Sequence, residues 1–231
     1  MASSDPPSDR PEPPPQHPFP LVPFEGASWY RVHELNPDTG QFEGDAFNDC
    51  GRGNARFSPL RQQGDGKVIP TLYLAEALQP ALAEVVLHDV PTPSTGYLHD
   101  LERDLRGHLH VSVLDIPESL LVANLTSHGL RAAGLEPHHL FAGNKPDYPR
   151  TRRWAQWIWE NQPDAQGLQW MSRRDNRYRV VMIFGDRVEP GAIQKKLGTV
   201  GTSGTASPLA GYEDLLVALL DQMGAGVMPR L

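Results

Sequence analysis

Two arginines, a tyrosine, a glutamate and a serine stand out in this sequence because of their types and their settings. They are Arg31, Arg56, Tyr73, Glu84 and Ser172. The planar fork of an arginine can donate two hydrogen bonds to one phosphate group. The sequence shows no histidine–aspartate pairing that would make Ser172 a nucleophile. The arginines therefore suit a phosphate-bearing ligand, and Ser172 is a candidate hydrogen-bonding residue.

Glu84 is the candidate carboxylate with the most informative surroundings. It lies 11 residues after Tyr73, which ends a short apolar strand, and it sits on a helix that Pro80 can start. Taken alone, Glu84 could simply be an exposed helix glutamate. Its aliphatic neighbours instead place it at the boundary of the core. Glu76 is the second candidate, because it lies nearer the end of the strand.

The other candidates also have simpler interpretations. Arg31 lies on an expected strand, where an arginine usually points outward, since arginine is seldom buried without a partner. Tyr73 could be a core aromatic residue, and Ser172 could be an ordinary strand serine. Asn176 is a weaker candidate from the same loop as Ser172. The histidines have no cysteine or carboxylate at metal-binding spacing, so we expect no metal site.

A mixture of strands and helices must position these residues. Alternating or β-branched apolar runs predict strands over residues 29–35, 68–75, 109–116, 167–171 and 178–184. Helices are expected over 78–88 and 149–161, the second capped by Thr151, and a last helix is expected to be capped by Ser207 with Pro208 at its first position. These elements do not alternate as regular βαβ units, so the fold class is α+β.

Composition indicates one globular domain with an N-terminal tail. The chain has 231 residues, 39% of them hydrophobic, and residues 1–23 hold nine of its 23 prolines. Such a segment buries little apolar surface, so we expect a disordered tail over 1–23 and a folded domain over 24–231. A loop rich in glycine, serine and threonine is expected over residues 198–207.

The net charge and the cysteine content indicate which partners and which cellular compartment to expect. The net charge is −7, which argues against broad nucleic-acid binding. The single cysteine, Cys50, excludes an internal disulfide framework and suits a reducing compartment. No apolar run is long enough to cross a membrane. We therefore expect a cytoplasmic protein that binds neither membranes nor nucleic acid directly.

In this order and in these settings, the five residues resemble the RES domain family, which is named after its arginine, glutamate and serine. The segments that carry the resemblance are Trp29-Tyr30-Arg31-Val32, Gly53-Asn54-Ala55-Arg56-Phe57-Ser58-Pro59, the run from Tyr73 to Glu84, and Gly167-Leu168-Gln169-Trp170-Met171-Ser172-Arg173-Arg174. The resemblance covers roughly residues 28–185. Phe57-Ser58 departs from the pattern, because a tryptophan–asparagine-like pair is expected after the arginine.

The resemblance implies a core like that of ADP-ribosyltransferases, with central strands flanked by helices. It also implies an enzyme that degrades NAD by cleaving the nicotinamide–ribose bond, by hydrolysis or phosphorolysis. NAD is then a substrate, phosphate an optional co-substrate, and no cofactor is required. The implied catalytic residues are Glu84, Arg31 and Ser172, and the implied NAD-binding residues are Arg31, Arg56, Tyr73, Ser172 and Asn176.

The resemblance further implies a partner, because family members are toxins of bacterial toxin–antitoxin systems of the RES–Xre type. The expected antitoxin is a DNA-binding protein that blocks the active site, and a homodimer of the toxin is expected within the complex. Two alternatives stay open. One is a protein ADP-ribosyltransferase with the same site, and the other is an inactive nucleotide-binding or interaction module.

Overall fold

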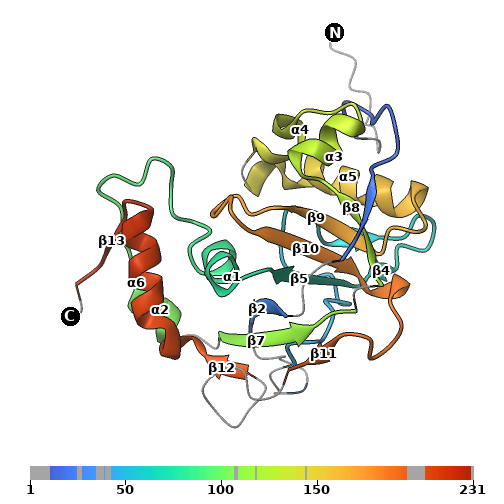
Figure 1. Ribbon diagram of the computed structural model, residues 1–231. Helices are drawn as coiled ribbons and strands as arrows, with labels where there is room; N and C mark the ends of the chain where they lie inside the picture. Colours follow the sequence, from blue (N-terminus) through green and yellow to red (C-terminus); the bar gives the residue numbers. More distant parts are fainter. Residues whose placement is uncertain are drawn as a thin grey trace.

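A computed structural model gives the fold (Figure 1). The structure describes residues 11–24, 28–34, 39, 43–106, 109–117, 119–143, 145–196 and 206–229. The expected loop over 198–207 lies almost entirely outside these residues. In the described part of the chain, no helix is long and apolar enough to cross a membrane.

In the described part of the chain, nine strands form a mixed sheet at the centre of the molecule. Eight of them follow one another in the order β1-β8-β9-β10-β5-β2-β7-β11, and β12 also pairs with β7. Their bounds are β1 Leu21–Pro23, β2 Trp29–His33, β5 Thr71–Ala75, β7 His110–Asp115, β8 Leu121–Asn124, β9 Gly167–Met171, β10 Arg179–Phe184, β11 Gln194–Lys195 and β12 Ala206–Pro208. All neighbours pair antiparallel except β8 and β9, which run parallel.

Two small strand pairs of the described residues lie outside the main sheet. In one, β3 (Leu60–Arg61) pairs antiparallel with β4 (Val68–Ile69), and in the other, β6 (Leu98–His99) pairs parallel with β13 (Gly226–Val227). The expected strand over 68–75 is thus two strands, β4 and β5. Pro70 separates them, because proline has no N–H to donate to a ladder.

The helices pack on one face of the sheet. They are α1 Leu78–Val85, α2 Leu101–Arg106, α3 Ser127–Ala132, α4 Pro137–Phe141, α5 Tyr148–Asn161 and α6 Glu213–Gln222, with short 3₁₀ helices at Lys145–Asp147, Gly185–Arg187 and Leu209–Tyr212. In Figure 1, α3, α4 and α5 gather near β8 and β9, while α6 and α2 lie beyond α1. The expected α+β class, with a central sheet flanked by helices, is confirmed.

Side-chain alternation divides each strand between two cores. On β5, Tyr73 packs into the core under the helices, whereas Leu72 and Leu74 belong to a second core on the reverse face. On β2, Val32 joins the first core and Trp29 the second. A side chain on a central strand therefore reaches only one face, and its position in the alternation decides which.

The last helix differs from its expected start. Ser207 and Pro208 lie in β12, and α6 begins at Glu213 after a 3₁₀ turn. The Ser-Pro pair resembled a helix cap in the sequence, but in the structure it pairs with β7 as part of a strand. At the other long helix, α5 begins at Tyr148, so Thr151 lies inside it, where its hydroxyl donates to the carbonyl oxygens of Tyr148 and Arg56.

The expected boundary at residue 23 does not match the structure, because residues 16–23 pack on the domain. Phe19 is 2% exposed and contacts the ring of Trp157. Its backbone exchanges two hydrogen bonds with the side chain of Gln162, at 3.0 and 2.8 Å. Beyond it, β1 pairs with β8. One buried aromatic residue and one short strand thus fix a segment that its prolines alone would leave disordered.

Two N-terminal deletions test this boundary. Deleting residues 2–23 should lower the melting temperature by about 10 °C or more, because losing a buried phenylalanine costs about 3–5 kcal/mol and each kcal/mol shifts a domain of this size by about 2–4 °C. Deleting residues 2–10 removes none of these contacts and should leave the melting temperature nearly unchanged. Equal melting curves for both deletions in differential scanning calorimetry would contradict the packing of Phe19.

Candidate active site

The carboxylate of Glu84, on α1, is held by the loop that follows β9. Its Oε1 atom accepts hydrogen bonds from the Ser172 hydroxyl at 2.6 Å and from the backbone N–H of Arg173 at 2.8 Å. The N–H of Arg174 lies 3.4 Å from the same oxygen. In the described part of the chain no donor contacts Oε2. Hydrogen bonds to one oxygen therefore fix the carboxylate, and the other oxygen keeps its capacity to accept a hydrogen bond.

Ser172 is positioned by the turn in which it lies. It is fully buried, and its N–H donates to the carbonyl of Tyr178 at 2.9 Å, across the base of the loop. Its hydroxyl oxygen accepts from the N–H groups of Arg174 at 3.1 Å and Asp175 at 3.0 Å. A short hydroxyl side chain is suited to such local backbone bonding. The same hydroxyl donates to Glu84, so it links the loop to the helix.

Glu76, the second candidate carboxylate, has another partner. Its Oε1 atom accepts from Arg179 Nη2 at 2.7 Å, and its Oε2 atom accepts from the N–H of Arg179 at 2.9 Å. These hydrogen bonds lower the pKa of Glu76. The ion pair joins the end of β5 to the start of β10. The structure therefore gives Glu76 a role in holding the sheet.

Arg56 is a buried cation on the helical side of the sheet. Its side chain donates to the carbonyl oxygens of Leu140 at 3.0 Å and Gly143 at 3.1 Å, and its guanidinium lies 4.9 Å from the centre of the Tyr148 ring. The residue is only 8% exposed. Burial lowers the pKa of Arg56, and the charge of Arg173 lowers it further. Arg56 is thus held by neutral oxygens and an aromatic face.

Tyr73 attaches the segment carrying Arg56 to β5. Its hydroxyl oxygen accepts from the N–H of Phe57 at 3.1 Å and also bonds the side chain of Ser58. Burial raises the pKa of Tyr73 to about 12, so the phenol stays protonated and remains a donor. Phe57 is fully buried, with its ring centre 5.0 Å from that of Trp170. The unusual Phe57-Ser58 pair therefore serves packing and attachment.

Hydrogen bonds connect these groups in one site. Arg56 and Arg173 both donate to the Gly143 carbonyl, and the N–H of Arg173 donates to Glu84. The negative charge of Glu84 raises the pKa of Arg56, which opposes the effect of burial. Ser172 joins them through its hydrogen bond to Glu84. The structure thus brings together Arg56, Tyr73, Glu84 and Ser172. Asn176 lies exposed on the loop after Ser172, and within the described part of the chain no hydrogen bond joins its side chain to these four residues.

Arg31 lies on the other face of the sheet. It shares the strand face of Trp29, and its Nη1 atom donates to the carbonyl oxygens of Gly44 at 2.7 Å and Ala46 at 2.6 Å. Burial lowers its pKa to about 10, which Asp45 partly opposes. Gly44 lies so close to β7 that an added Cβ would fall 2.3 Å from the Ser112 hydroxyl. Arg31 therefore anchors a loop and does not join the other four residues.

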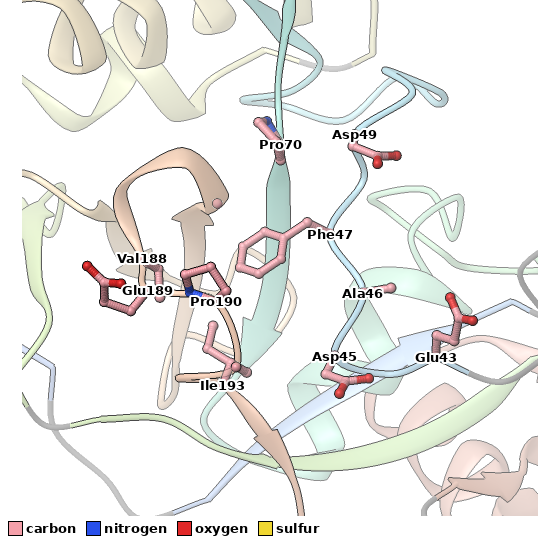
Figure 2. A pocket seen from close by; sticks show the side chains of 12 residues that line it. Glu43, Asp45, Ala46, Phe47, Asp49, Pro70, Val188, Glu189, Pro190 and Ile193 are labelled. Atoms are coloured by element: carbon pink, nitrogen blue, oxygen red, sulfur yellow. The ribbon is translucent and has the colours of Figure 1, made fainter.

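The reverse face also carries a cavity of about 490 Å³. Residues 43–49 and 185–193 form its two walls, and the Phe47 ring projects between them near Pro190 (Figure 2). None of the six expected site residues lines it. The cavity and the Glu84 site are thus separated by the sheet. Among the described residues, no group of three or more His, Cys, Asp or Glu is arranged to hold a metal ion.

Sequence reasoning missed two contributors to the site. Arg173 directly follows Ser172 and lies close enough to Arg56 to affect its pKa. In the sequence, its position beside the candidate serine was the feature that could have identified it. The carbonyl of Gly143, which accepts from both Arg56 and Arg173, gave no signal, because a backbone oxygen has no sequence signature.

Comparison with known proteins assigns the family. A family model described as "RES domain" matches residues 28–200. This chain belongs to the RES domain family. The match includes every residue of the site, together with Arg31 and Asn176. A comparison with curated proteins found no significant match.

The fold of this RES protein also resembles a solved structure. A chain of the M. tuberculosis MbcT–MbcA toxin–antitoxin complex superposes with a TM-score of 0.54 at 19% sequence identity. The alignment covers 84% of this chain and 91% of that one. At this identity the likeness concerns the fold, and it extends over nearly the whole domain.

Replacing Arg31 tests its structural role. Arg31→Met should lower the free energy of unfolding by about 2–4 kcal/mol, because two partly buried carbonyl groups lose their donor. Arg106→Met is the matched control, since Arg106 is an exposed arginine paired with Glu102 and should change stability by less than about 0.5 kcal/mol. Urea denaturation measures both variants. Equal midpoints for Arg31→Met and the control would show that Arg31 does not hold the loop.

Proposed function

We propose that this RES protein is an enzyme that cleaves the bond between nicotinamide and ribose in NAD. The observation that carries the proposal is the fixed carboxylate of Glu84. Its Oε1 atom is held by Ser172 and by loop N–H groups, and Oε2 is left for a ligand. The buried cation of Arg56 is linked to this carboxylate through Gly143 and Arg173. A preorganised carboxylate beside a phosphate-attracting cation suits this reaction.

The chemistry requires little proton transfer at the leaving group. When the bond between ribose C1′ and nicotinamide N1 breaks, its electron pair passes to N1 and neutralises the positive ring. Positive charge develops at C1′ and the ring oxygen of the ribose. A carboxylate fixed in advance stabilises this charge without having to reorganise. Because nicotinamide leaves as a neutral molecule, Glu84 need not act as a general acid.

The remaining residues would bind and orient the dinucleotide. Arg56 has neutral hydrogen-bond acceptors, so its full charge remains available to attract a diphosphate. Tyr73 stays protonated up to high pH and can donate to a ribose hydroxyl or stack on a ring. Ser172 would act through Glu84, because its hydroxyl proton is already directed at that carboxylate. Ser172 is therefore a positioning residue in this proposal.

Three acceptors can complete the reaction at the same site. Water gives ADP-ribose, inorganic phosphate gives ADP-ribose 1″-phosphate, and a protein side chain gives an ADP-ribosylated protein. In each case an oxygen or nitrogen of the acceptor forms the new bond to C1′ and loses a proton if it carries one. Incubation with labelled NAD, with and without phosphate, and separation of the products distinguishes the three. If no nicotinamide is released, the protein is not an NAD-cleaving enzyme, and the alternative of an inactive binding module is favoured.

The carboxylate is tested by substitution. Glu84→Gln should reduce kcat for NAD cleavage by about 10²–10³-fold with little change in the melting temperature, because one preorganised charge is lost. Ser172→Ala should reduce it by about 10-fold, since one oriented hydrogen bond is lost. Glu102→Gln, a substitution on α2 outside the site, is the control and should leave kcat nearly unchanged. Nicotinamide release by Glu84→Gln within a few-fold of wild type would refute the assignment.

We further propose that the enzyme is a toxin controlled by a protein antitoxin. The support is the RES family together with the fold shared with a chain of a toxin–antitoxin complex. The antitoxin would be a DNA-binding protein that covers the Glu84 site, and the toxin would form a homodimer in the complex. A partner at this site would stop NAD entry without unfolding the enzyme.

Expression in bacteria tests the toxin proposal. Wild-type protein produced alone should deplete cellular NAD and arrest growth, because every turnover destroys a molecule that the cell needs. Glu84→Gln, produced at the same level, should allow normal growth. The NAD content of extracts and the optical density of the cultures are the measurements. Normal growth with soluble, folded wild-type protein would refute the proposal.

A further inference from the structure

Arg173 contacts two parts of the site at once. Its backbone N–H donates to Glu84 Oε1 at 2.8 Å, and its side-chain Nη1 donates to the carbonyl oxygen of Gly143, also at 2.8 Å. The residue is exposed on the loop after β9. Its backbone therefore fixes the carboxylate, while its long side chain reaches the segment between α4 and α5.

The carbonyl oxygen of Gly143 accepts hydrogen bonds from two arginine side chains. Arg56 Nη2 donates to it at 3.1 Å, beside the hydrogen bond from Arg173. In the described part of the chain neither guanidinium is paired with a carboxylate. The charge of Arg173 lowers the pKa of Arg56, which is the effect of two like charges that lie close together. Two positive charges thus converge on one neutral oxygen.

The neighbouring basic residues are compensated in other ways. Arg177 forms an ion pair with Asp175 at 2.8 Å, and Lys145 forms one with Asp89 at 2.8 Å. Arg174 donates from its side chain to the carbonyl oxygens of His88 and Val90. Arg173 differs from these because, among the described residues, a single carbonyl accepts a hydrogen bond from its exposed side chain. The side chain of Arg173 would give up this one hydrogen bond in order to bind an anion.

We propose that Arg56 and Arg173 form a phosphoryl-binding pair, in which the side chain of Arg173 leaves the Gly143 carbonyl to bind a phosphate group of the ligand. The inference rests on the proposed function, which supplies the diphosphate of a dinucleotide. A free phosphate ion has the same chemistry. Arg56 is the fixed member of the pair and Arg173 the adjustable one. Their planar forks match the oxygens of a phosphoryl group.

The pair gives the site a basis for specificity. The residue that binds the phosphoryl group with its side chain holds Glu84 Oε1 with its N–H. A dinucleotide can therefore engage both arginines while its ribose lies at the carboxylate. A nucleoside such as nicotinamide riboside has no phosphoryl group to engage them. We expect Arg173 to favour NAD over the nucleoside.

Calorimetric titration of the purified protein tests the pair without turnover. The probes are ADP-ribose, inorganic pyrophosphate and inorganic phosphate. Arg173→Ala should weaken ADP-ribose and pyrophosphate binding by about 10- to 100-fold, as expected for loss of a charge-assisted hydrogen bond. Arg173→Lys should weaken it less. Arg177→Ala, which removes a paired arginine of the same loop, should bind all three probes within about twofold of wild type.

The outcomes separate the two phosphate sources and the two proposals. Weaker binding of inorganic phosphate with unchanged ADP-ribose affinity would support the pair and assign it to a free phosphate ion. Unchanged affinity of Arg173→Ala for all three probes, with an unchanged melting temperature, would overturn the pair. Wild-type protein that binds pyrophosphate through Arg173 but releases no nicotinamide from NAD would support the pair and refute NAD cleavage.

Discussion

The hydrogen bond between Glu84 and Ser172 is the contact on which the site depends. The two residues are 88 positions apart in sequence, and their hydroxyl and carboxylate oxygens lie 2.6 Å apart. Sheet order makes this contact possible, because β10 alone separates β9 from β5. Helix α1 follows β5, and the Ser172 loop follows β9. A helix after one strand and a loop after another thus meet above the same end of the sheet.

The rest of the site is attached to that contact from the neighbouring elements. Tyr73 on β5 holds the segment with Arg56, and the carbonyls of Leu140 and Gly143 hold the Arg56 side chain. Each of these attachments uses a hydrogen bond from a buried or half-buried group. Such groups are costly to leave unpaired, which makes the arrangement well determined. The open oxygen of Glu84 and the shared carbonyl of Gly143 are the two places where a ligand could replace or add a contact.

Local patterns in the sequence predicted the elements that carry the site. Strand alternation located β2, β7, β9 and β10, and the apolar run before Tyr73 located β5 and α1. The face of a strand residue was harder to predict. Arg31 and Val32 are adjacent, yet they lie on opposite faces, and only the cores on each side show which face carries the site. The burial of Phe19 was equally hidden, because its partners Trp157 and Gln162 are distant in sequence.

The charge distribution explains how an acidic protein can offer a site for an anion. The chain carries a net charge of −7, yet two guanidiniums without carboxylate partners in the described residues meet at Gly143. Neutral carbonyls orient these cations without cancelling their charge, and burial of Arg56 reduces solvent screening. A small, doubly charged diphosphate would feel this local field at short range. Two cations held by neutral carbonyls thus give an acidic chain a local site suited to a small anion.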